Sequence, residues 1–327
     1  MNAQIGITEA KIGVCYGMDG NNLPSYADVV NLYKKYGISN VRVFDPNPDA
    51  LEPLRGKVIN VALGVMNLDL PHLATSQEFA DSWVADFVSR FHDIPYSYIS
   101  VGNEAIPGEY AVNVAPAMRN IQNALEKQGR ATVRVTTAVS WAALANSLPP
   151  WVASVSTFAP EARDAMVQVL CFLEAHGSQL MINVYPYHGY ASDPVNVHQD
   201  YAVFTAPGPV IYDGSLGYQN LFDMMVDSFY WAMEKEGHGN VTVVVSGTGW
   251  PSAGNGDLTN AVLAQAYNKG FVQHISSSGT PKRPNVLMDG FLFAMFNENL
   301  KPDGVEQNFG LFYPNMTEVY TVFPPRQ

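Results

Sequence analysis

Eight short runs rich in β-branched and aromatic residues recur along the chain, and segments with helical periodicity separate them. The strand-like runs cover residues 11–17, 40–45, 58–65, 96–104, 131–140, 179–187, 240–247 and 287–298. The helical segments cover residues 25–37, 48–56, 76–92, 114–129, 162–177, 218–237 and 260–277, and several of them end on Gly. Strands that are apolar on both faces and alternate with helices predict a parallel sheet with helical crossovers.

Eight β/α units in a chain of 327 residues fit a closed (β/α)8 barrel, the TIM barrel, better than an open doubly wound sheet. An open sheet gives a similar alternation, but no G-x-G-x-x-G follows the first strand and the sequence has no P-loop. We therefore expect an α/β fold with one (β/α)8 domain over residues 11–327. Residues 1–10, MNAQIGITEA, have the character of a tag-like or leftover N-terminal segment.

The chain is acidic, with a formal net charge of −12 and a pI near 4.9. Nucleic acids and anionic membranes attract basic surfaces, so neither is an expected partner, and no apolar stretch approaches the roughly 18 residues of a membrane-spanning helix. The N-terminus lacks the basic and apolar regions of a secretory signal, which leaves a cytoplasmic protein or one whose signal has been removed. The sequons Asn240-Val-Thr and Asn315-Met-Thr favour the second alternative. We expect a secreted monomer.

The cysteines and histidines suggest structural roles. Cys15 lies in a strand-like run and Cys171 in a helical one, and we expect two free, buried thiols because buried Cys packs as a small hydrophobic residue. The seven histidines form no i,i+4 pair and no H-E-x-x-H motif, so we expect neither a metal site nor a cofactor.

Functional residues of a (β/α)8 barrel lie at the carboxyl ends of its strands. The ends of the predicted strands carry aromatic, amide and carboxyl groups, namely Tyr16, Phe44, Asp45, Asn103, Glu104, Tyr185, Tyr187, Trp250, Asn297 and Glu298. Aromatic faces stack on sugar rings, and amides and carboxylates bind hydroxyl groups, so this rim predicts a carbohydrate groove. Gly247 is unusual at a strand end, because a glycine there loses packing and marks a bulge or a close approach.

Several motifs together resemble those of the plant β-1,3-glucanases of glycoside hydrolase family 17. They follow the family's order from about residue 11 to the C-terminus and include IGVCYG, NNLP, VGNE, PAMRNI, NVYPY, YQNLFD, GWPSAG, GTPKRP, FAMFNEN and EQNFGLFYPN. The resemblance implies a (β/α)8 barrel that cleaves β-1,3-glucan internally with retention of configuration, outside the cell or in the cell wall. It also implies an acid/base Glu after an Asn on the fourth strand and a nucleophilic Glu on the seventh.

Transferred to this chain, the resemblance makes Glu104 the acid/base and Asn103 the partner of the sugar 2-hydroxyl. The nucleophile falls on position 247, where the family's VVVSE(S/T)GWPSAG is VVVSGTGWPSAG here. Glu298 is assigned to the carboxylate and amide network around the reacting sugar. The remaining predicted substrate-binding residues are aromatic, namely Phe44, Tyr185, Tyr187, Trp250 and Phe309.

The missing carboxylate changes the expected activity. Retaining cleavage needs two carboxyl groups roughly 5 to 5.5 Å apart, and neither Glu298 nor Glu306 is expected to replace the nucleophile. We expect negligible hydrolysis, retained β-1,3-glucan binding, and open space beside Gly247 in which an α-glycosyl fluoride could react as a glycosynthase donor. The alternative is a naturally non-catalytic β-glucan-binding or defence-related surface protein. The residues leave open whether Gly247 is engineered or natural.

Overall fold

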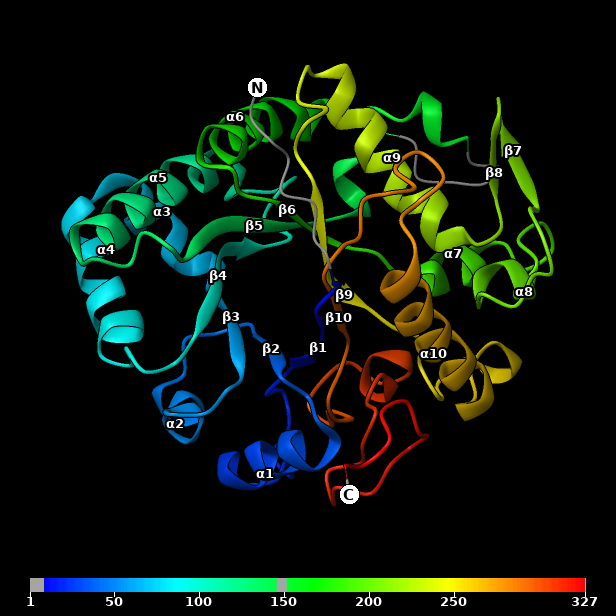
Figure 1. Cartoon of the computed structure of the whole chain (residues 1–327), viewed down its shortest axis with the longest axis horizontal. Helices are drawn as coiled ribbons and strands as arrows, with labels where there is room; N and C mark the ends of the chain where they lie inside the picture. Colours follow the sequence, from blue (N-terminus) through cyan, green and yellow to red (C-terminus); the bar gives the residue numbers. More distant parts are fainter. Residues whose placement is uncertain (1–8, 146–151, 327) are drawn as a thin grey trace.

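The computed structural model describes residues 9–145 and 152–326, and its parallel strands close into a barrel surrounded by helices (Figure 1). Around the barrel the strands follow the order β1-β10-β9-β6-β5-β4-β3-β2. Their bounds are β1 (Ile12–Tyr16), β2 (Asn40–Val43), β3 (Asn60–Val65), β4 (Tyr96–Asn103), β5 (Arg134–Ser140), β6 (Leu180–Asn183), β9 (Val243–Thr248) and β10 (Gly290–Leu292). The predicted (β/α)8 fold is confirmed.

The helices lie outside the strands and cover the barrel (Figure 1). Their bounds are α1 (Tyr26–Tyr36), α2 (Pro48–Leu51), α3 (Leu70–Thr75), α4 (Gln77–Val84), α5 (Ala111–Lys127), α6 (Pro160–His176), α7 (Pro186–Ser192), α8 (Gln199–Ala202), α9 (Leu221–Lys235) and α10 (Ala261–Ser277). Helix α1 shows why these boundaries arise: Ser25 accepts a hydrogen bond from Asp28 N at its start, and Gly37 takes the left-handed conformation at its end.

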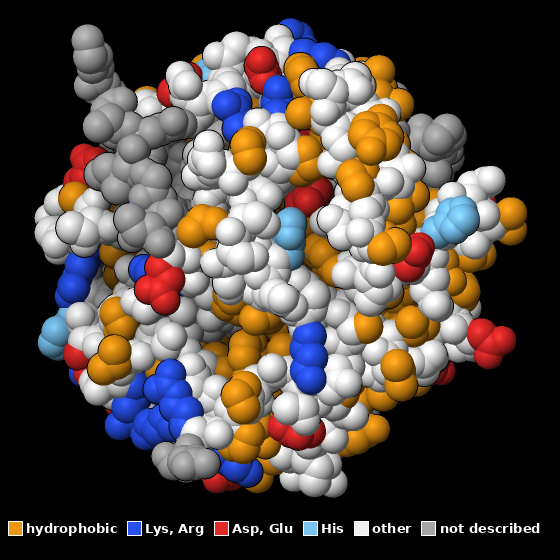
Figure 2. Space-filling model, turned by 45° about the vertical axis from the view of Figure 1, so that its right-hand side comes forward, with side chains coloured by type: hydrophobic (Ala, Val, Ile, Leu, Met, Phe, Trp, Pro, Cys, Tyr) orange, Lys and Arg blue, Asp and Glu red, His pale blue; other side chains and the backbone are white. Residues whose placement is uncertain are grey.

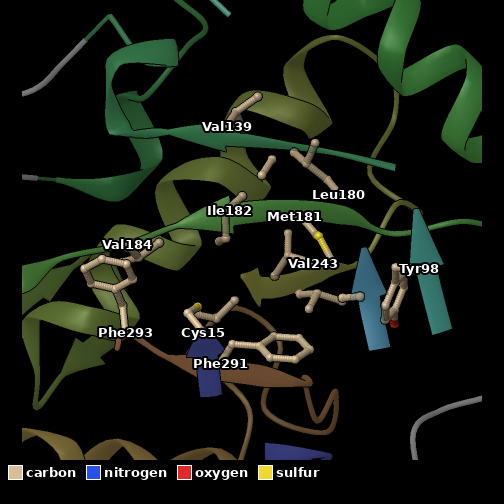
Figure 3. Close-up of a cluster of buried hydrophobic side chains, with 14 of the residues drawn as sticks. Cys15, Tyr98, Val139, Leu180, Met181, Ile182, Val184, Val243, Phe291 and Phe293 are labelled. Atoms are coloured by element: carbon tan, nitrogen blue, oxygen red, sulfur yellow. The ribbon is translucent and has the colours of Figure 1, made fainter. Parts of the chain in front are cut away.

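The interior of the barrel is a hydrophobic core. Tyr98 of β4, Met181 of β6 and Phe291 of β10 point toward one another across it (Figure 3). Cys15 and Met181 have no exposed surface, and Tyr98 is anchored by a hydrogen bond of 2.7 Å from its hydroxyl to Gln179 Oε1. This packing fixes the strand ends that carry the site described below.

The structure corrects the predicted strand over residues 179–187. Strand β6 ends at Asn183, and Pro186 begins helix α7, so Tyr187 is on a helix and Tyr185 is its N-cap residue. Proline lacks a donor for a strand ladder but is well suited to the first turn of a helix, which explains the early end. The short helices α3, α7 and α8 and a hairpin of β7 (Ile211–Asp213) and β8 (Leu216–Tyr218) were not predicted, because elements of this length leave little periodic signal.

One of the two thiols differs from the prediction. Cys15 is buried and Cys171 is exposed, and both are free. The apolar side of α6 is formed by Met166, Val169, Leu170 and Leu173, and Cys171 faces away from it. Most of the predicted N-terminal segment, residues 1–8, lies outside the described residues.

Candidate active site

The ends of β4, β6 and β9 meet beside a cavity of about 630 Å³. Asn183 ends β6 and pairs in register with Gly247 of β9, while Asn103 ends β4 and Glu104 follows it. The cavity is lined mainly by polar and aromatic residues, among them Tyr16, Asp19, Phe44, Asp45, Asn103, Glu104, Trp141, Asn183, Tyr185, His188, Phe293, Lys301, Glu306 and Phe309. Figure 2 shows hydrophobic side chains in a hollow on one face of the molecule, with charged side chains around it.

A buried arginine organises these strand ends. Arg42 of β2 is 2% exposed, and burial lowers the pKa of its guanidinium group. Its Nη2 donates to Asn103 Oδ1 at 2.7 Å, and its Nη1 donates to Asn183 Oδ1 at 3.0 Å and to the Ser246 carbonyl at 2.8 Å. One cation therefore holds residues from three other strands, and its charge strengthens each of these hydrogen bonds.

Glu104 is fixed by amide groups. Asn183 Nδ2 donates to Glu104 Oε1 at 2.7 Å and to Asn103 Oδ1 at 3.0 Å. The backbone of Asn103 is held as well, because Asn67 Oδ1 accepts from its N–H at 2.9 Å and Asn67 Nδ2 donates to its carbonyl at 2.9 Å. Glu104 has a left-handed backbone, with φ of 53°, and its side chain is exposed to the cavity. A carboxyl group held in this way can donate a proton to a bound molecule or accept one from it.

Position 247 faces the same amide. A Cβ atom added to Gly247 would lie 3.1 Å from Asn183 Oδ1 and 2.9 Å from the Tyr185 hydroxyl. Glu104 and a side chain at 247 would thus contact opposite ends of one amide group, as the prediction of facing strand ends requires. The Tyr185 hydroxyl narrows the space at this Cβ position, because an added atom there would be tightly packed against it.

The backbone does not explain the glycine. The pairing of β9 shifts register near Gly247 against both β6 and β10, which marks a β-bulge or another irregularity of the ladder. Its φ lies outside the left-handed region, however, so the backbone conformation does not require glycine at this position.

Aromatic rings form one wall of the cavity. Tyr185 packs against Phe309 and Phe293 with ring centroids 5.8 and 6.2 Å apart, and Phe44 lies 6.1 Å from Phe293. The Arg42 guanidinium lies 4.5 Å from the centre of the Phe44 ring. The predicted residues Phe44, Tyr185 and Phe309 therefore come together, and Phe293 joins them.

Two predicted aromatic residues lie behind this wall. Tyr187 is 2% exposed and Trp250 has no exposed surface, and neither is among the described residues that line the cavity. Their ring centroids are 5.2 Å apart. The Tyr187 hydroxyl accepts a hydrogen bond from Asn255 Nδ2, and Trp250 Nε1 donates to the Leu258 carbonyl. The predicted direct contact with substrate is corrected for both: they support the wall from behind.

Glu298 is also set back from the cavity. Its side chain is 2% exposed, and its Oε1 accepts a hydrogen bond of 2.9 Å from Asp19 N. Burial raises the pKa of Glu298, which favours the neutral carboxyl group. A side chain at Gly17 would displace this carboxyl group from its position. Glu298 holds the loop after β1, which contributes Asp19 to the cavity, and this corrects its predicted place around the reacting sugar.

The sequence prediction missed Arg42, Asn67, Asn183, Trp141 and His188. Two of these residues left a signal in the sequence: Arg42 is a cation inside the apolar run NVRV, and Asn183 is an amide at the end of the run LMIN. Among the described residues, no group of three His, Cys, Asp or Glu side chains could hold a metal ion, and no helix is both long and apolar enough to cross a membrane.

An exposed carboxyl group in an amide network, beside an aromatic wall at the carboxyl ends of a parallel barrel, matches one of the two carboxyl groups that glycoside hydrolases use. The sequence profile described as glycosyl hydrolases family 17 matches residues 12–323, and the chain belongs to this family.

Relatives and solved structures agree with this assignment. The chain is 48% identical over 316 residues to a probable glucan endo-1,3-beta-glucosidase of Arabidopsis thaliana, covering 95% of this chain and 90% of the relative. It is 44% identical to lichenase-2 of Hordeum vulgare, covering 95% and 97%. Among solved structures, a plant beta-glucan endohydrolase matches with a TM-score of 0.91 at 43% identity, covering 95% and 99%. A beta-1,3-glucanase and allergen of Cryptomeria japonica pollen matches with a TM-score of 0.90 at 43% identity, covering 95% and 98%.

Proposed function

We propose that this chain binds β-1,3-glucan in the cavity between β4, β6 and β9, on the scaffold of a retaining endo-β-1,3-glucanase that lacks its nucleophile. The observation that carries the proposal is the position of the Asn183 side chain between the two strand ends. Its Nδ2 donates to Glu104, and its Oδ1 faces position 247. The names of the relatives supply the substrate class, because three relatives of 42–48% identity are described as known or probable glucan endo-1,3-beta-glucosidases.

Each residue has a role in this proposal. Glu104 donates the proton to the leaving oxygen. Asn103 binds the 2-hydroxyl through its amide nitrogen, because its Oδ1 already accepts from Arg42 and Asn183. Phe44, Tyr185, Phe293 and Phe309 present ring faces and edges to the sugars. Tyr187, Trp250 and Glu298 act indirectly by holding the residues that line the cavity.

The missing carboxylate at 247 determines what the chain can do. Without it, no glycosyl ester forms and no negative charge stabilises the oxocarbenium-like transition state. By analogy with removal of a nucleophile in another hydrolase, the rate falls by up to about 10⁶-fold. Glu104 is kept, so an acceptor hydroxyl can give its proton to Glu104 and attack the anomeric carbon of an α-glycosyl fluoride, whose configuration mimics the glycosyl ester, while fluoride leaves.

Two measurements test this proposal. Titration calorimetry with laminari-oligosaccharides should show binding, and Glu104→Gln should keep most of it. Incubation with α-laminaribiosyl fluoride and an aryl glucoside acceptor should give longer oligosaccharides, and Glu104→Gln should abolish them. Absence of glucan binding refutes the proposal as a whole, whereas binding without elongation removes its glycosynthase part.

A second route to activity is chemical rescue. Formate or azide entering beside Arg42 and Tyr185 would replace the missing nucleophile and restore cleavage of an activated aryl glucoside. Because the Tyr185 hydroxyl lies 2.9 Å from the Cβ position of residue 247, Tyr185→Phe should increase rescue by enlarging this space. A flat response to both anions in both proteins would show that position 247 does not face the bound sugar.

The second candidate is a naturally non-catalytic, secreted glucan-binding or defence-related protein of the cell surface or cell wall. In both proposals residues 11–327 act as one domain and as a monomer. Binding does not separate them, because both predict it, but restoration of the carboxylate does. A vigorous glucanase after Gly247→Glu means that the remaining machinery is intact, and an inert variant favours long-standing loss of catalysis.

A further inference from the structure

A cysteine, a histidine and a glutamate meet on the outer surface, where α6 lies near the end of α9. Cys171 Sγ lies 3.5 Å from His238 Nε2, and His238 Nδ1 lies 2.7 Å from Glu174 Oε2. Cys171 is exposed, while the side chain of His238 is only 13% exposed. The proposed glucan chemistry uses none of these residues.

Both helices hold the three groups in place. Cys171 and Glu174 are three residues apart on α6, so they share a face of the helix. His238 follows Gly237, a residue after the end of α9 whose φ is 86°. The N–H of His238 donates to the Met233 carbonyl at 2.9 Å. This is the hydrogen bond of a glycine-terminated helix, and it fixes the backbone from which the imidazole projects.

An ion pair fastens the same two elements together. Arg163 of α6 binds both carboxylate oxygens of Glu236, at 2.7 and 2.9 Å, two residues before His238. A bidentate pair of this kind restricts the relative movement of the two segments. The thiol, imidazole and carboxylate therefore have a defined arrangement.

We infer that Cys171 is a reactive thiol that exchanges with small disulfides, with His238 as its base and Glu174 as the group that orients the base. The Glu174 carboxylate accepts the hydrogen on Nδ1, so the Nε2 lone pair of neutral His238 faces the thiol. Transfer of the thiol proton to Nε2 gives a thiolate beside an imidazolium ion. The same order of nucleophile, base and orienting acid recurs on unrelated folds and is identified by its geometry.

The exchange step balances without an added oxidant or reductant. The Cys171 thiolate attacks one sulfur of the small disulfide, forming a protein–sulfur bond as the original sulfur–sulfur bond breaks. The leaving thiolate takes the proton from His238. The products are one mixed disulfide and one small thiol, and the relay returns to its starting protonation state.

This site is separate from the glucan cavity. His238 lies in the segment that leads into the amino-terminal end of β9, whereas Asn103, Glu104 and Asn183 lie at the carboxyl ends of their strands. Modification of Cys171 should therefore leave glucan affinity unchanged. The other thiol serves as an internal reference, because Cys15 has no exposed surface and burial raises its pKa to about 12.

The test uses the full chain and dithiodipyridine at near-neutral pH, with the released thiopyridone followed by absorbance and the product identified by intact mass. We expect one fast equivalent, which Cys171→Ser removes. An ordinary thiol is only a few per cent thiolate at neutral pH, and an ion-paired thiolate gains population but loses some nucleophilicity. His238→Gln should therefore slow the reaction about tenfold, whereas the matched surface control Glu161→Gln on α6 should not change it.

Equal rates for the unchanged protein and a folded His238→Gln variant would overturn the inference, because Cys171 would then be an ordinary exposed thiol. If His238→Gln does not fold, Glu174→Gln carries the test, since the Glu174 side chain is 41% exposed. A slower reaction in Glu174→Gln supports the relay, and an unchanged rate overturns it.

Discussion

Replacement of Arg42 by Met tests whether the buried guanidinium holds the site together. Arg42 makes three hydrogen bonds to buried or half-buried acceptors, and a bond from a charged donor contributes about 1.5–3 kcal/mol. Methionine keeps much of the aliphatic volume but donates no hydrogen bond. Loss of the three bonds is the main cost of the substitution.

Two effects reduce this cost. The acceptors keep other donors: Ser246 Oγ lies 2.8 Å from Asn183 Oδ1, and Asn183 Nδ2 lies 3.0 Å from Asn103 Oδ1. Removal of a buried charge also recovers part of its desolvation cost. The expected net loss is therefore about 3 kcal/mol of unfolding free energy, below the simple sum of the bonds.

Urea denaturation of both proteins measures this loss, and titration calorimetry with a laminari-oligosaccharide measures its consequence. With Asn103 and Asn183 less restrained, glucan affinity should fall about tenfold, which corresponds to about 1.4 kcal/mol. Arg55→Met is the matched control, because Arg55 pairs with Asp93 and Glu52 on the surface, and it should change neither quantity measurably. An Arg42→Met protein that keeps both its stability and its affinity would refute the role assigned to this residue.

Three further predictions concern the wall, a buried acid and a helix end. Tyr185→Ala should weaken glucan binding about tenfold, whereas Trp250→Phe should lower the melting temperature and leave the dissociation constant for glucan unchanged. If calorimetry shows weaker binding for Trp250→Phe and unchanged binding for Tyr185→Ala, the placing of Tyr185 in the wall and of Trp250 behind it is contradicted. Burial raises the pKa of Asp227 to about 7, so the folded state binds this proton more tightly than the unfolded state does. The stability of the protein relative to Asp227→Asn should therefore fall as pH rises from about 4 to about 7 and then level off, and urea unfolding across this range measures it. Gly177→Ala should cost about 1 kcal/mol of unfolding free energy, because φ is 62° and an added Cβ meets no atom within 4 Å, so the cost comes from the left-handed backbone alone. Equal stability of the two proteins in urea unfolding would show that this backbone conformation does not require glycine.

The fold could be predicted from the sequence because most strands are predominantly apolar and seven of the eight strand-like runs are followed by a helical segment. These patterns are local and repeat along the chain, as with NVRV before α2 and VVVSGT before α10. Strand ends were less certain. Only the proline at 186 shows that β6 stops at Asn183, and the aromatic residues around it continue a strand-like composition.

The site was predicted in part. Glu104 and position 247 follow from the motifs, but their bridge through Asn183 and Arg42 joins residues 79 and 141 positions apart in the chain. Such pairs depend on how the barrel closes, and no local pattern encodes them. The burial of Tyr187 has the same origin, because Tyr187 accepts a hydrogen bond from Asn255, 68 positions away, and packs against Trp250.

The exposure of Cys171 could have been predicted. The apolar positions of α6 recur with helical spacing at 166, 169, 170 and 173, and residue 171 falls off that side. Its pairing with His238 could not, because that residue lies after α9, 67 positions from Cys171 in the chain.

The most direct test of the central claim is the initial rate of laminarin hydrolysis after Gly247→Glu, measured by the release of reducing ends. The same rate is measured for the unchanged protein and for the double variant Gly247→Glu with Glu104→Gln. The new carboxylate would extend toward Asn183 and displace the Tyr185 hydroxyl by a few tenths of an ångström. The account predicts negligible release by the unchanged protein, a gain of several orders of magnitude in the single variant, and loss of that gain in the double variant. Substantial hydrolysis by the unchanged protein, or a gain that survives the removal of Glu104, would contradict it.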